Sequence, residues 1–595
     1  MNNSLRYIVR KVKIFSEIAL GLTVGFSIIS LITTIGFYVS KETLHVLSTG
    51  TNIVMLIFIF QELARFYFAP KKQIHLIERW FEILVSFLFI FLLFDITFFQ
   101  NIVSYFFKRL STTELQSINL TILNIILIGT FFIKSTKYLD SLLKLNLHPS
   151  ALFALSFATI IFTGSIFLSL PKATIAGAST SYLDALFTST SAVCVTGLVV
   201  NNTATHFTLF GQIIILLLIQ IGGLGVMTLT TFFAAIVSGG LSVRVRFLMK
   251  EFFSQLNAGT IAKLIWRIFF FTLTIELIGA VILYISSDPV NYNGMGDLAF
   301  QSIFHSVSAF CNAGFSILQN GMMEKFVLNN PIYTLNIMVL IVLGGLGFTV
   351  LWDLSSYLRR DTHKNLKKFS RTHLSASSKL VLITSAVLIF GGGIIIFLLF
   401  QFQGFTKGSF FFNLYHSLFL SVTSRTAGFN TLASEGLSFS IAFFVIFLMW
   451  IGASPGSTGG GIKTTTFSLI FLSLFNTIRG KERLEIFNRE ISPKNINNAF
   501  QVLLANIGAL SIGILVLLII ENNMQPLDLV FEAVSAASTV GLSRNVTPYL
   551  QSGSKIVIIL LMFIGRVGFL NFFLAFYKPS KEPEYHYKTD TIMVG

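Results

Sequence analysis

The sequence predicts an all-α polytopic membrane protein in which four pseudo-symmetric repeats surround one pore, preceded by a four-helix extension. Three observations predict this class. The 595 residues are 54% hydrophobic and only 11% charged, a balance that is not typical of soluble domains. Roughly twelve apolar stretches approach the length of about 20 residues that crosses a bilayer core. The third observation is a short glycine motif that occurs four times at nearly equal spacing.

The repeated motif ends each time in a glycine followed by a bulky apolar residue. Its glycines are separated by 117, 114 and 113 residues (314−197, 428−314 and 541−428). Each motif follows a short segment rich in Ser, Thr and Ala and precedes a full-length apolar span. The residues that we expect to hold a cation are Val195, Thr196, Gly197, Asn312, Ala313, Gly314, Thr426, Ala427, Gly428, Thr539, Val540 and Gly541.

Four such turns around one axis would present rings of backbone carbonyls, which can replace the hydration shell of a bare cation. Glycine adopts backbone angles that a residue with a Cβ would resist, so the carbonyls can turn toward a common axis. The alternative is that these glycines close ordinary re-entrant turns in another kind of polytopic protein. The fourfold recurrence favours the pore.

The repeats follow one another along the chain. We assign residues 1–148 to the N-terminal extension, 149–245 to repeat one, 246–370 to repeat two, 371–484 to repeat three, and 485–595 to repeat four and a cytoplasmic tail. We expect first spans at 151–169, 262–286, 378–402 and 498–520, and pore segments at 182–198, 297–315, 410–429 and 527–542. The expected second spans are 208–236, 333–355, 438–475 and 554–577.

The net charge of +16 comes largely from basic residues in short loops between the spans. Because cytoplasmic loops are enriched in Lys and Arg, membrane orientation explains this charge better than a nucleic-acid partner. The same rule places both termini in the cytoplasm and the glycine turns outside. The two cysteines, Cys194 and Cys311, predict neither a disulfide framework nor a metal cluster.

The N-terminal extension contains four expected spans, near 14–38, 46–64, 80–99 and 118–136. The segment from Glu62 to Pro70 and the span that follows resemble the second and third helices of voltage-sensor domains. The fourth span, however, has no arginine, and gating charges are what a voltage sensor moves. Two interpretations remain: a sensor-like packing domain without voltage sensing, and an unrelated four-helix extension.

Residues 151–577 resemble the Ktr/Trk/HKT superfamily of potassium transporters, most of all its bacterial KtrB (TrkH-like) subunits. The four turns carry this resemblance together with two glycine-rich second spans, Ile221 to Gly225 and Leu343 to Gly347, and above all the run GASPGSTGGGIKTTT from Gly452 to Thr466. The first 150 residues depart from the short N-terminus of that pattern.

The resemblance implies a single-chain pore that passes K⁺, Na⁺-linked in some members, in a bacterial-type cell (inner) membrane. It also implies a homodimer on a ring of cytosolic nucleotide-binding subunits of the KtrA/TrkA kind, no bound cofactor, and no metal other than K⁺ at the filter. Relatives that prefer Na⁺ often have serine in place of the first filter glycine. Gly197 therefore favours K⁺.

The second span of repeat three is expected to carry a gate. From Ile441 to Phe475 it has 35 residues, far more than the roughly 20 that cross a bilayer, and its middle holds five glycines and a proline. Irregular backbone at membrane depth is tolerated only where protein or water covers it, which fits a flexible loop under the filter. The expected gate residues are Gly452, Ser454, Pro455, Gly456, Gly459, Gly460, Gly461 and Lys463, with Arg566 facing them from the last span.

Arg425 is the one cation within a glycine motif. A cation beside a cation pathway should turn its guanidinium away from the axis, and an unpaired buried charge is costly. Glu532 is a carboxylate well inside the fourth pore segment, so we expect an ion pair between Arg425 and Glu532 that braces segments three and four. The alternative is that local backbone groups satisfy each residue and the two never meet.

Other functional classes fit less well. A two-half secondary transporter should show symmetry at half its length rather than a period of one repeat. The histidines form no His-Glu-x-x-His pair, and His305 and His416 lie at different offsets from their glycines, so we expect no catalytic residues and no enzyme. The sequence does not choose between a channel-like uniport and Na⁺- or H⁺-coupled uptake.

Overall fold

The computed structural model describes residues 21–67, 80–94, 117–127, 149–175, 178, 180–225, 261–361, 374–404, 409–481 and 483–576. The expected basic N-terminal tail and the C-terminal tail beyond residue 576 lie outside this part, as do the ends of several expected spans, including residues 226–236 of repeat one. Within it, the prediction of an all-α membrane fold is confirmed. The one sheet among the described residues is a two-stranded hairpin of β1 (Glu485–Ile486) and β2 (Arg489–Glu490).

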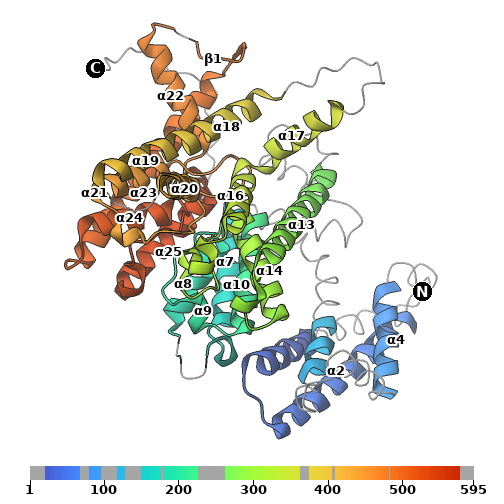
Figure 1. The fold of residues 1–595 in the computed structure, drawn as a ribbon. Helices are drawn as coiled ribbons and strands as arrows, with labels where there is room; N and C mark the ends of the chain where they lie inside the picture. Colours follow the sequence, from blue (N-terminus) through green and yellow to red (C-terminus); the bar gives the residue numbers. More distant parts are fainter. Residues whose placement is uncertain are drawn as a thin grey trace, which may run out of the picture.

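The N-terminal extension contains four described helices (Figure 1, blue). These are Gly21–Gly36, α2 (Lys41–Tyr67), α4 (Trp80–Phe94) and Ser117–Leu127. Phe58, Phe89 and Leu127 belong to their shared apolar core, while the Asn124 amide donates to Ser30 Oγ at 2.9 Å inside the bundle. The extension contacts repeat one where Lys172 Nζ donates to the Thr34 carbonyl at 2.9 Å.

Each repeat begins with a first helix, followed by a shorter pore helix that ends at a glycine turn. The first helices are α7 (Pro149–Leu168), α13 (Ile261–Ser286), the continuous series α18 (Ala376–Ala386), η4 (Val387–Gly391) and α19 (Gly392–Gln403), and α23 (Pro493–Ile520). The pore helices are α8 (Tyr182–Val193), α14 (Met295–Phe310), α20 (Phe410–Thr423) and α24 (Pro526–Ala537).

The second helices begin beyond the turns and complete the repeats. They are α10 (Leu209–Leu224), α16 (Pro331–Leu346) with α17 (Phe348–Asp361), α21 (Phe439–Trp450) with α22 (Thr464–Ile478), and α25 (Ser552–Val567) with α26 (Phe569–Phe576). Figure 1 shows α16 at the centre, with the helices of repeats one and two on one side of it and those of repeats three and four on the other.

The same packing contact recurs in all four repeats and aligns them residue by residue. A glycine of the first helix faces a leucine of the second helix so closely that a Cβ would collide with it; the pairs are Gly164 and Leu218, Gly279 and Leu340, Gly392 and Leu448, and Gly513 and Leu561. Close approach of this kind is what small residues permit between helices in lipid. This contact fixes the depth of the first helix relative to the second helix in each repeat.

A hydroxyl group of the pore helix fixes this alignment in three repeats. Ser189 Oγ donates to the Ile161 carbonyl at 2.7 Å, and Ser306 Oγ donates to the Glu276 carbonyl at 2.6 Å. Ser421 Oγ donates to the Ile389 carbonyl at 2.8 Å. Repeat four has Ala533 at the corresponding place, eight residues before its glycine as Ser189 and Ser306 are.

The second spans of repeats two and four are not the continuous helices that we expected. The chain bends by 101° between Leu346 and Phe348 and by 95° between Val567 and Phe569. At both breaks, and at the end of α10, the helix stops at a glycine with positive φ, namely Gly347, Gly568 and Gly225. A left-handed residue ends the helical hydrogen-bond series, so the glycine motif breaks the helix as well as allowing close packing.

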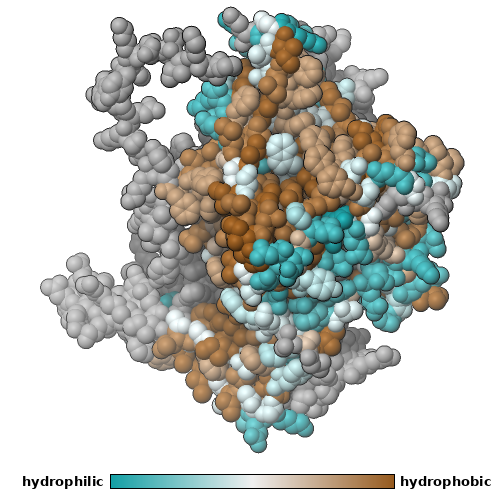
Figure 2. Space-filling model, turned by 90° about the vertical axis from the view of Figure 1, so that its left-hand side faces the viewer, coloured by the Kyte–Doolittle hydropathy of each residue, from teal (hydrophilic) through white to brown (hydrophobic). Residues whose placement is uncertain are grey.

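The breaks change how the spans are counted. Among the described residues, five helices are long and apolar enough to cross a bilayer, or up to seven when each bent pair is taken as one span. Further apolar helices, such as α10 and α21, are shorter than a full crossing. Figure 2 shows a broad hydrophobic surface over one face of the molecule, and exposed apolar side chains such as Phe390, Phe443 and Leu515 fit contact with lipid.

Candidate ion pathway

The four glycine turns share one unusual backbone conformation. The residue two before each glycine is left-handed, with φ of 57° at Val195, 59° at Asn312, 74° at Thr426 and 52° at Thr539. The glycines themselves have φ between 69° and 93°. Non-glycine residues rarely adopt positive φ, so its recurrence at four equivalent positions shows that the repeats form the same turn.

The four turns close into a ring. A Cβ on Gly197 would lie 2.5 Å from the carbonyl oxygen of Ala313, and one on Gly314 would lie 2.7 Å from that of Ala427. Gly428 stands in the same relation to the Val540 carbonyl, and Gly541 to the Thr196 carbonyl. The repeats are therefore arranged one, two, three, four around a common centre, and each glycine meets a backbone carbonyl of its neighbour.

Hydroxyl side chains hold the turns to their own pore helices. The amide of Gly197 donates to Ser191 Oγ at 3.0 Å, and the amide of Gly541 donates to Ser535 Oγ at 3.1 Å. In repeats two and three the hydroxyl bonds to the residue after the glycine, from Ser308 Oγ to the Phe315 carbonyl at 2.8 Å and from Thr423 Oγ1 to the Phe429 carbonyl at 2.5 Å. Sequence reasoning missed these residues, although a serine six residues before Gly197, Gly314 and Gly541 was a visible signal.

A cavity of about 390 Å³ opens above the ring. All four turn glycines line it, together with polar residues such as Asn202, Asn430 and Ser543. Glu435 is the one charged residue among those described in its wall. A polar cavity with a single acidic residue among its described lining suits the approach of a hydrated cation to the ring.

The loop of repeat three, residues 451–463, lies against the turns from below. A parallel bridge between Ile451 and Ile462 closes its base, and the amide of Gly460 donates to Thr539 Oγ1 at 2.9 Å. Gly459 packs so closely on Thr426 that a Cβ would collide with its hydroxyl. The loop thus touches turns three and four directly at the residues with left-handed backbone.

The loop is also bound to its neighbours. The amides of Ser454 and Thr458 donate to the carbonyls of Gly345 and Gly344 at 3.1 and 3.3 Å. Those carbonyls are available because α16 ends at Leu346, so the helix break in repeat two provides acceptors for the loop in repeat three. Lys463 Nζ donates back to the Gly459 carbonyl at 2.7 Å, which satisfies this cation within the loop itself.

Arg566 bridges the loop and repeat one. Its guanidinium donates to the Thr458 carbonyl in the loop and to the Gly222 carbonyl at the end of α10. By the packing alignment Arg566 occupies the position of Gly223, Gly345 and Ala453 in the other repeats, one residue after Gly565. The structure thus places Arg566 of the last span beside the loop, where two backbone carbonyls accept hydrogen bonds from its guanidinium.

The expected Arg425 to Glu532 ion pair is wrong. The Arg425 guanidinium donates to the carbonyls of Ser385 and Gly452, both at 3.4 Å. Glu532 accepts from the hydroxyl of Thr547 within its own repeat. Neither residue forms an ion pair with any residue that the structure describes.

The third pore helix ends differently from the other three. Pore helices one, two and four end in a cap at Cys194, Cys311 and Ser538, directly before the left-handed residue. Pore helix three ends at Thr423 and is capped by Ser424, so Arg425 stands between the cap and Thr426. Measured from the hydroxyl that holds the turn, the stretch to the glycine is nevertheless one residue shorter than in the other repeats, because Thr423 lies five residues before Gly428 whereas the equivalent serines lie six before their glycines. Ser424 therefore takes the cap position that counting back from the glycine gave to Arg425.

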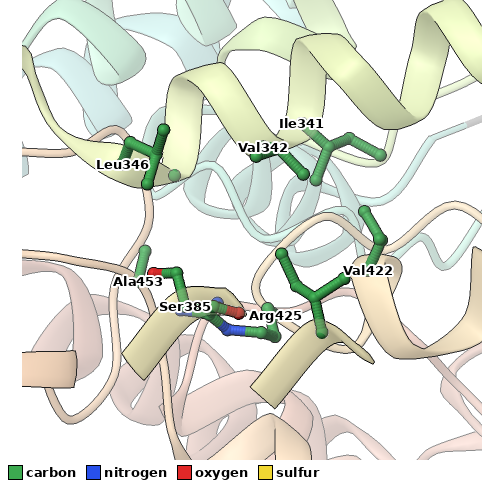
Figure 3. Close-up of a pocket in the computed structure, with 9 residues that line it drawn as sticks. Ile341, Val342, Leu346, Ser385, Val422, Arg425 and Ala453 are labelled. Atoms are coloured by element: carbon green, nitrogen blue, oxygen red, sulfur yellow. The ribbon is translucent and has the colours of Figure 1, made fainter. Parts of the chain in front are cut away.

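The Arg425 side chain lies at the interface between repeats two and three. It lines a cavity of about 20 Å³ with Ile341, Val342 and Leu346 of repeat two and Ser385 and Ala453 of repeat three (Figure 3). In the ring order, repeats two and four lie on opposite sides of repeat three. Arg425 therefore faces away from the repeat that carries Glu532.

Independent effects are expected when the two residues are changed together. Arg425→Gln, Glu532→Gln and the double variant should give stability changes that add within about 0.5 kcal/mol, as separated sites do. Thermal unfolding of the purified variants measures this. A coupling well above that value would mean that the two side chains meet, contrary to the structure.

The pore-helix histidines have ordinary hydrogen-bonding roles, as expected. His305 Nε2 lies 2.8 Å from Ser316 Oγ, and His416 Nδ1 lies 2.9 Å from Thr431 Oγ1. Within the described residues no group of His, Cys, Asp and Glu is arranged to hold a metal ion.

Two ion pairs join elements around the outside of the ring. Lys555 Nζ of α25 lies 2.6 Å from Asp184 Oδ1 of α8, which links repeat four to repeat one. Arg544 Nε lies 2.6 Å from Asp528 Oδ1, and its Nη1 also donates to carbonyls of Ser434 and Leu437 in repeat three. The sequence analysis did not identify these contacts. Lys555 and Asp184 lie 371 residues apart, and Arg544 lies 110 and 107 residues from Ser434 and Leu437.

Comparisons with known proteins agree with this architecture. Residues 126–585 match the TrkH family, described as cation transport protein. The chain is 37% identical over 457 residues to the potassium/sodium uptake protein NtpJ of Enterococcus hirae, an alignment covering 76% of this chain and 98% of that protein. It is also 37% identical over 460 residues to the Ktr system potassium uptake protein B of Bacillus subtilis, covering 77% and 99%.

A solved structure shares the fold. The potassium transporter TrkH from Vibrio parahaemolyticus matches with a TM-score of 0.58 at 18% sequence identity, covering 82% of this chain and 96% of that one. The family match excludes the first 125 residues, which contain most of the N-terminal extension. Over the four repeats and their shared ring, this protein belongs to the TrkH family of cation transport proteins.

Proposed function

We propose that this protein takes up K⁺ through the ring of four glycine turns, and that the loop of repeat three gates the pathway below the ring. The observation that carries the proposal is the closed ring, in which each glycine meets a backbone carbonyl of the next repeat. Carbonyl rings replace the hydration shell of a permeating cation. The names of the relatives, which are potassium or potassium/sodium uptake proteins, support K⁺ as the ion.

The contacts of the loop support its role as a gate. It combines five glycines with bonds to turn four, to the end of α16 and to Arg566. A segment that is rich in glycine and held mainly by backbone hydrogen bonds can leave its place without disrupting an apolar core. Lys463 and Arg566 add positive charge at this level, which opposes cation passage while the loop is in place.

The wider setting is part of the same proposal. The protein acts in the cell membrane, with the cavity above the ring facing outside and both termini in the cytoplasm. It works as a homodimer on a cytosolic ring of nucleotide-binding subunits. The exposed basic residues Arg479, Lys481 and Arg483 after α22 suit the cytoplasmic side, where such a regulator would sit.

Growth rescue tests the function. A bacterium that lacks its own K⁺ uptake systems should grow at low external K⁺ when it expresses this chain with its regulatory subunit, and comparison with and without Na⁺ shows whether uptake is Na⁺-linked. The control is the same strain with the empty vector. If the strain fails to grow while the protein is present in the membrane at normal level, the proposal is wrong.

A further inference from the structure

Glu276 breaks the symmetry of the four repeats. The serine contacts of the pore helices align its position with Ile161 and Ile389, and its distance of three residues from Gly279 aligns it with Leu510, three before Gly513. Three repeats thus have an apolar residue where repeat two has a carboxylate. Glu276 is 4% exposed, so its charge is not placed there for contact with water.

The contacts of Glu276 leave its charge without a cation. Gln220 Nε2, from the second helix of repeat one, lies 3.2 and 3.1 Å from the two carboxylate oxygens. Cys311 Sγ donates to Oε1 at 3.7 Å. No Lys or Arg in the described part of the chain forms an ion pair with it. A buried carboxylate with only an amide and a thiol for partners is costly unless positive charge is nearby.

The contact with Cys311 places the carboxylate directly behind the second turn. Cys311 caps pore helix two and is followed at once by Asn312, the left-handed residue of that turn. With 3.7 Å from Oε1 to Sγ and about 3.8 Å per residue of backbone, the charge lies on the order of 10 Å from the carbonyl ring. Glu276 lies at the interface between repeats one and two, where it contacts Gln220, whereas Arg425 lies at the interface between repeats two and three, so the two charges approach the ring from different sides.

We propose that the permeating cation is the counter-charge of Glu276, and that Glu276 sets the affinity of the ring for monovalent cations. This inference rests on the proposed function of the ring. At the effective dielectric constant of about 20 that suits protein sites, a unit charge about 10 Å away changes the binding constant of a cation by about tenfold. Glu276 acts through its field and does not touch the ion, while Gln220 and Cys311 position the carboxylate.

The test separates charge from shape. Glu276→Gln keeps the size of the side chain and an oxygen that can accept from Cys311, but it removes the charge. We expect the KM for K⁺ uptake to rise by about tenfold, with Vmax retained. Because the lost attraction is the same for every monovalent cation, the KM values for K⁺, Rb⁺ and Na⁺ should rise by one common factor and the selectivity should stay unchanged.

Two control variants complete the test. Glu276→Asp retains the charge and should restore a KM close to that of the wild type. Glu42→Gln removes an exposed carboxylate of α2 in the N-terminal extension, outside the ring and the loop, and its uptake should equal that of the wild type. All variants are compared at equal amounts in the membrane, by uptake of ⁸⁶Rb⁺ and ²²Na⁺ and by K⁺ depletion.

Three results would overturn the inference. An unchanged KM in Glu276→Gln would mean that the carboxyl group carries no charge that the ion feels. Unequal factors for K⁺ and Na⁺ would mean that the substitution alters the shape of the second turn, so Glu276 would be structural. A Glu276→Asp variant as impaired as Glu276→Gln would point to position rather than charge. Lack of uptake by the wild-type protein would instead refute the proposed function itself.

Discussion

Replacing Gly197 with serine is expected to lower the preference of this protein for K⁺ over Na⁺ by about tenfold or more. The backbone at Gly197 has φ of +93°, and a Cβ there would lie 2.5 Å from the Ala313 carbonyl oxygen. Left-handed backbone costs a residue with a Cβ roughly 1–2 kcal/mol, and about 1.4 kcal/mol is a factor of ten. The strain falls on a carbonyl that the ion would contact.

Paired ⁸⁶Rb⁺ and ²²Na⁺ fluxes in membrane vesicles measure this preference. Gly404→Ser is the matched control, because Gly404 also has positive φ, of 57°, but no atom of the described residues lies within 4 Å of the position that a Cβ would take. This control should keep the wild-type ratio. A Gly197→Ser protein that discriminates between the two ions as well as the wild type would show that the first turn does not determine selectivity.

Deleting residues 456–460 should raise basal K⁺ flux several-fold and weaken control by the cytosolic subunit. The deletion removes the backbone groups that bind Thr539, Gly344 and Arg566, and it leaves Ile451 and Ile462, which close the base of the loop. With the segment gone, the loop loses its contacts with Thr426 of turn three and Thr539 of turn four. K⁺ flux into vesicles, measured with and without the regulatory subunit, shows the effect.

A point variant serves as an internal check on the deletion. Arg566→Gln shortens the side chain that donates to the Thr458 carbonyl. It should raise basal K⁺ flux, but by less than the deletion does. It also removes a positive charge from the level of the loop, so both changes favour passage. Wild-type basal flux in the deletion variant, with normal amounts of folded protein in the membrane, would exclude the loop as the gate.

The main architecture could be predicted because it depends on local signals. Gly197, Gly314, Gly428 and Gly541 follow segments of the same composition at the same spacing, and the structure joins them in one ring. The irregular run after Trp450 was visible as an apolar span interrupted by glycines and a proline. These features depend on what each short stretch of chain can do by itself.

The rest could not be predicted because it depends on where the pore helices end and on contacts between repeats. Counting back from Gly428 made Arg425 equivalent to Cys194, but pore helix three ends one residue earlier and gives that place to Ser424. The breaks at Gly347 and Gly568 were hidden because the same glycines also fit close helix packing. Glu276 was visible as a carboxylate in an apolar span, a feature that by itself indicates function, yet its partner Cys311 appears only in the fold.

The closure of the ring has a consequence for how the protein is made. Gly541 meets the Thr196 carbonyl, Lys555 pairs with Asp184, and Arg566 reaches Gly222, so the last repeat completes the circle against the first. Synthesis proceeds from the N-terminus, and earlier segments fold while later ones are still absent. A nascent chain that has inserted only three repeats therefore lacks the fourth turn, and its carbonyls cannot form the closed ring. In the pathway that we propose, carbonyls can surround an ion only after the final spans have been inserted.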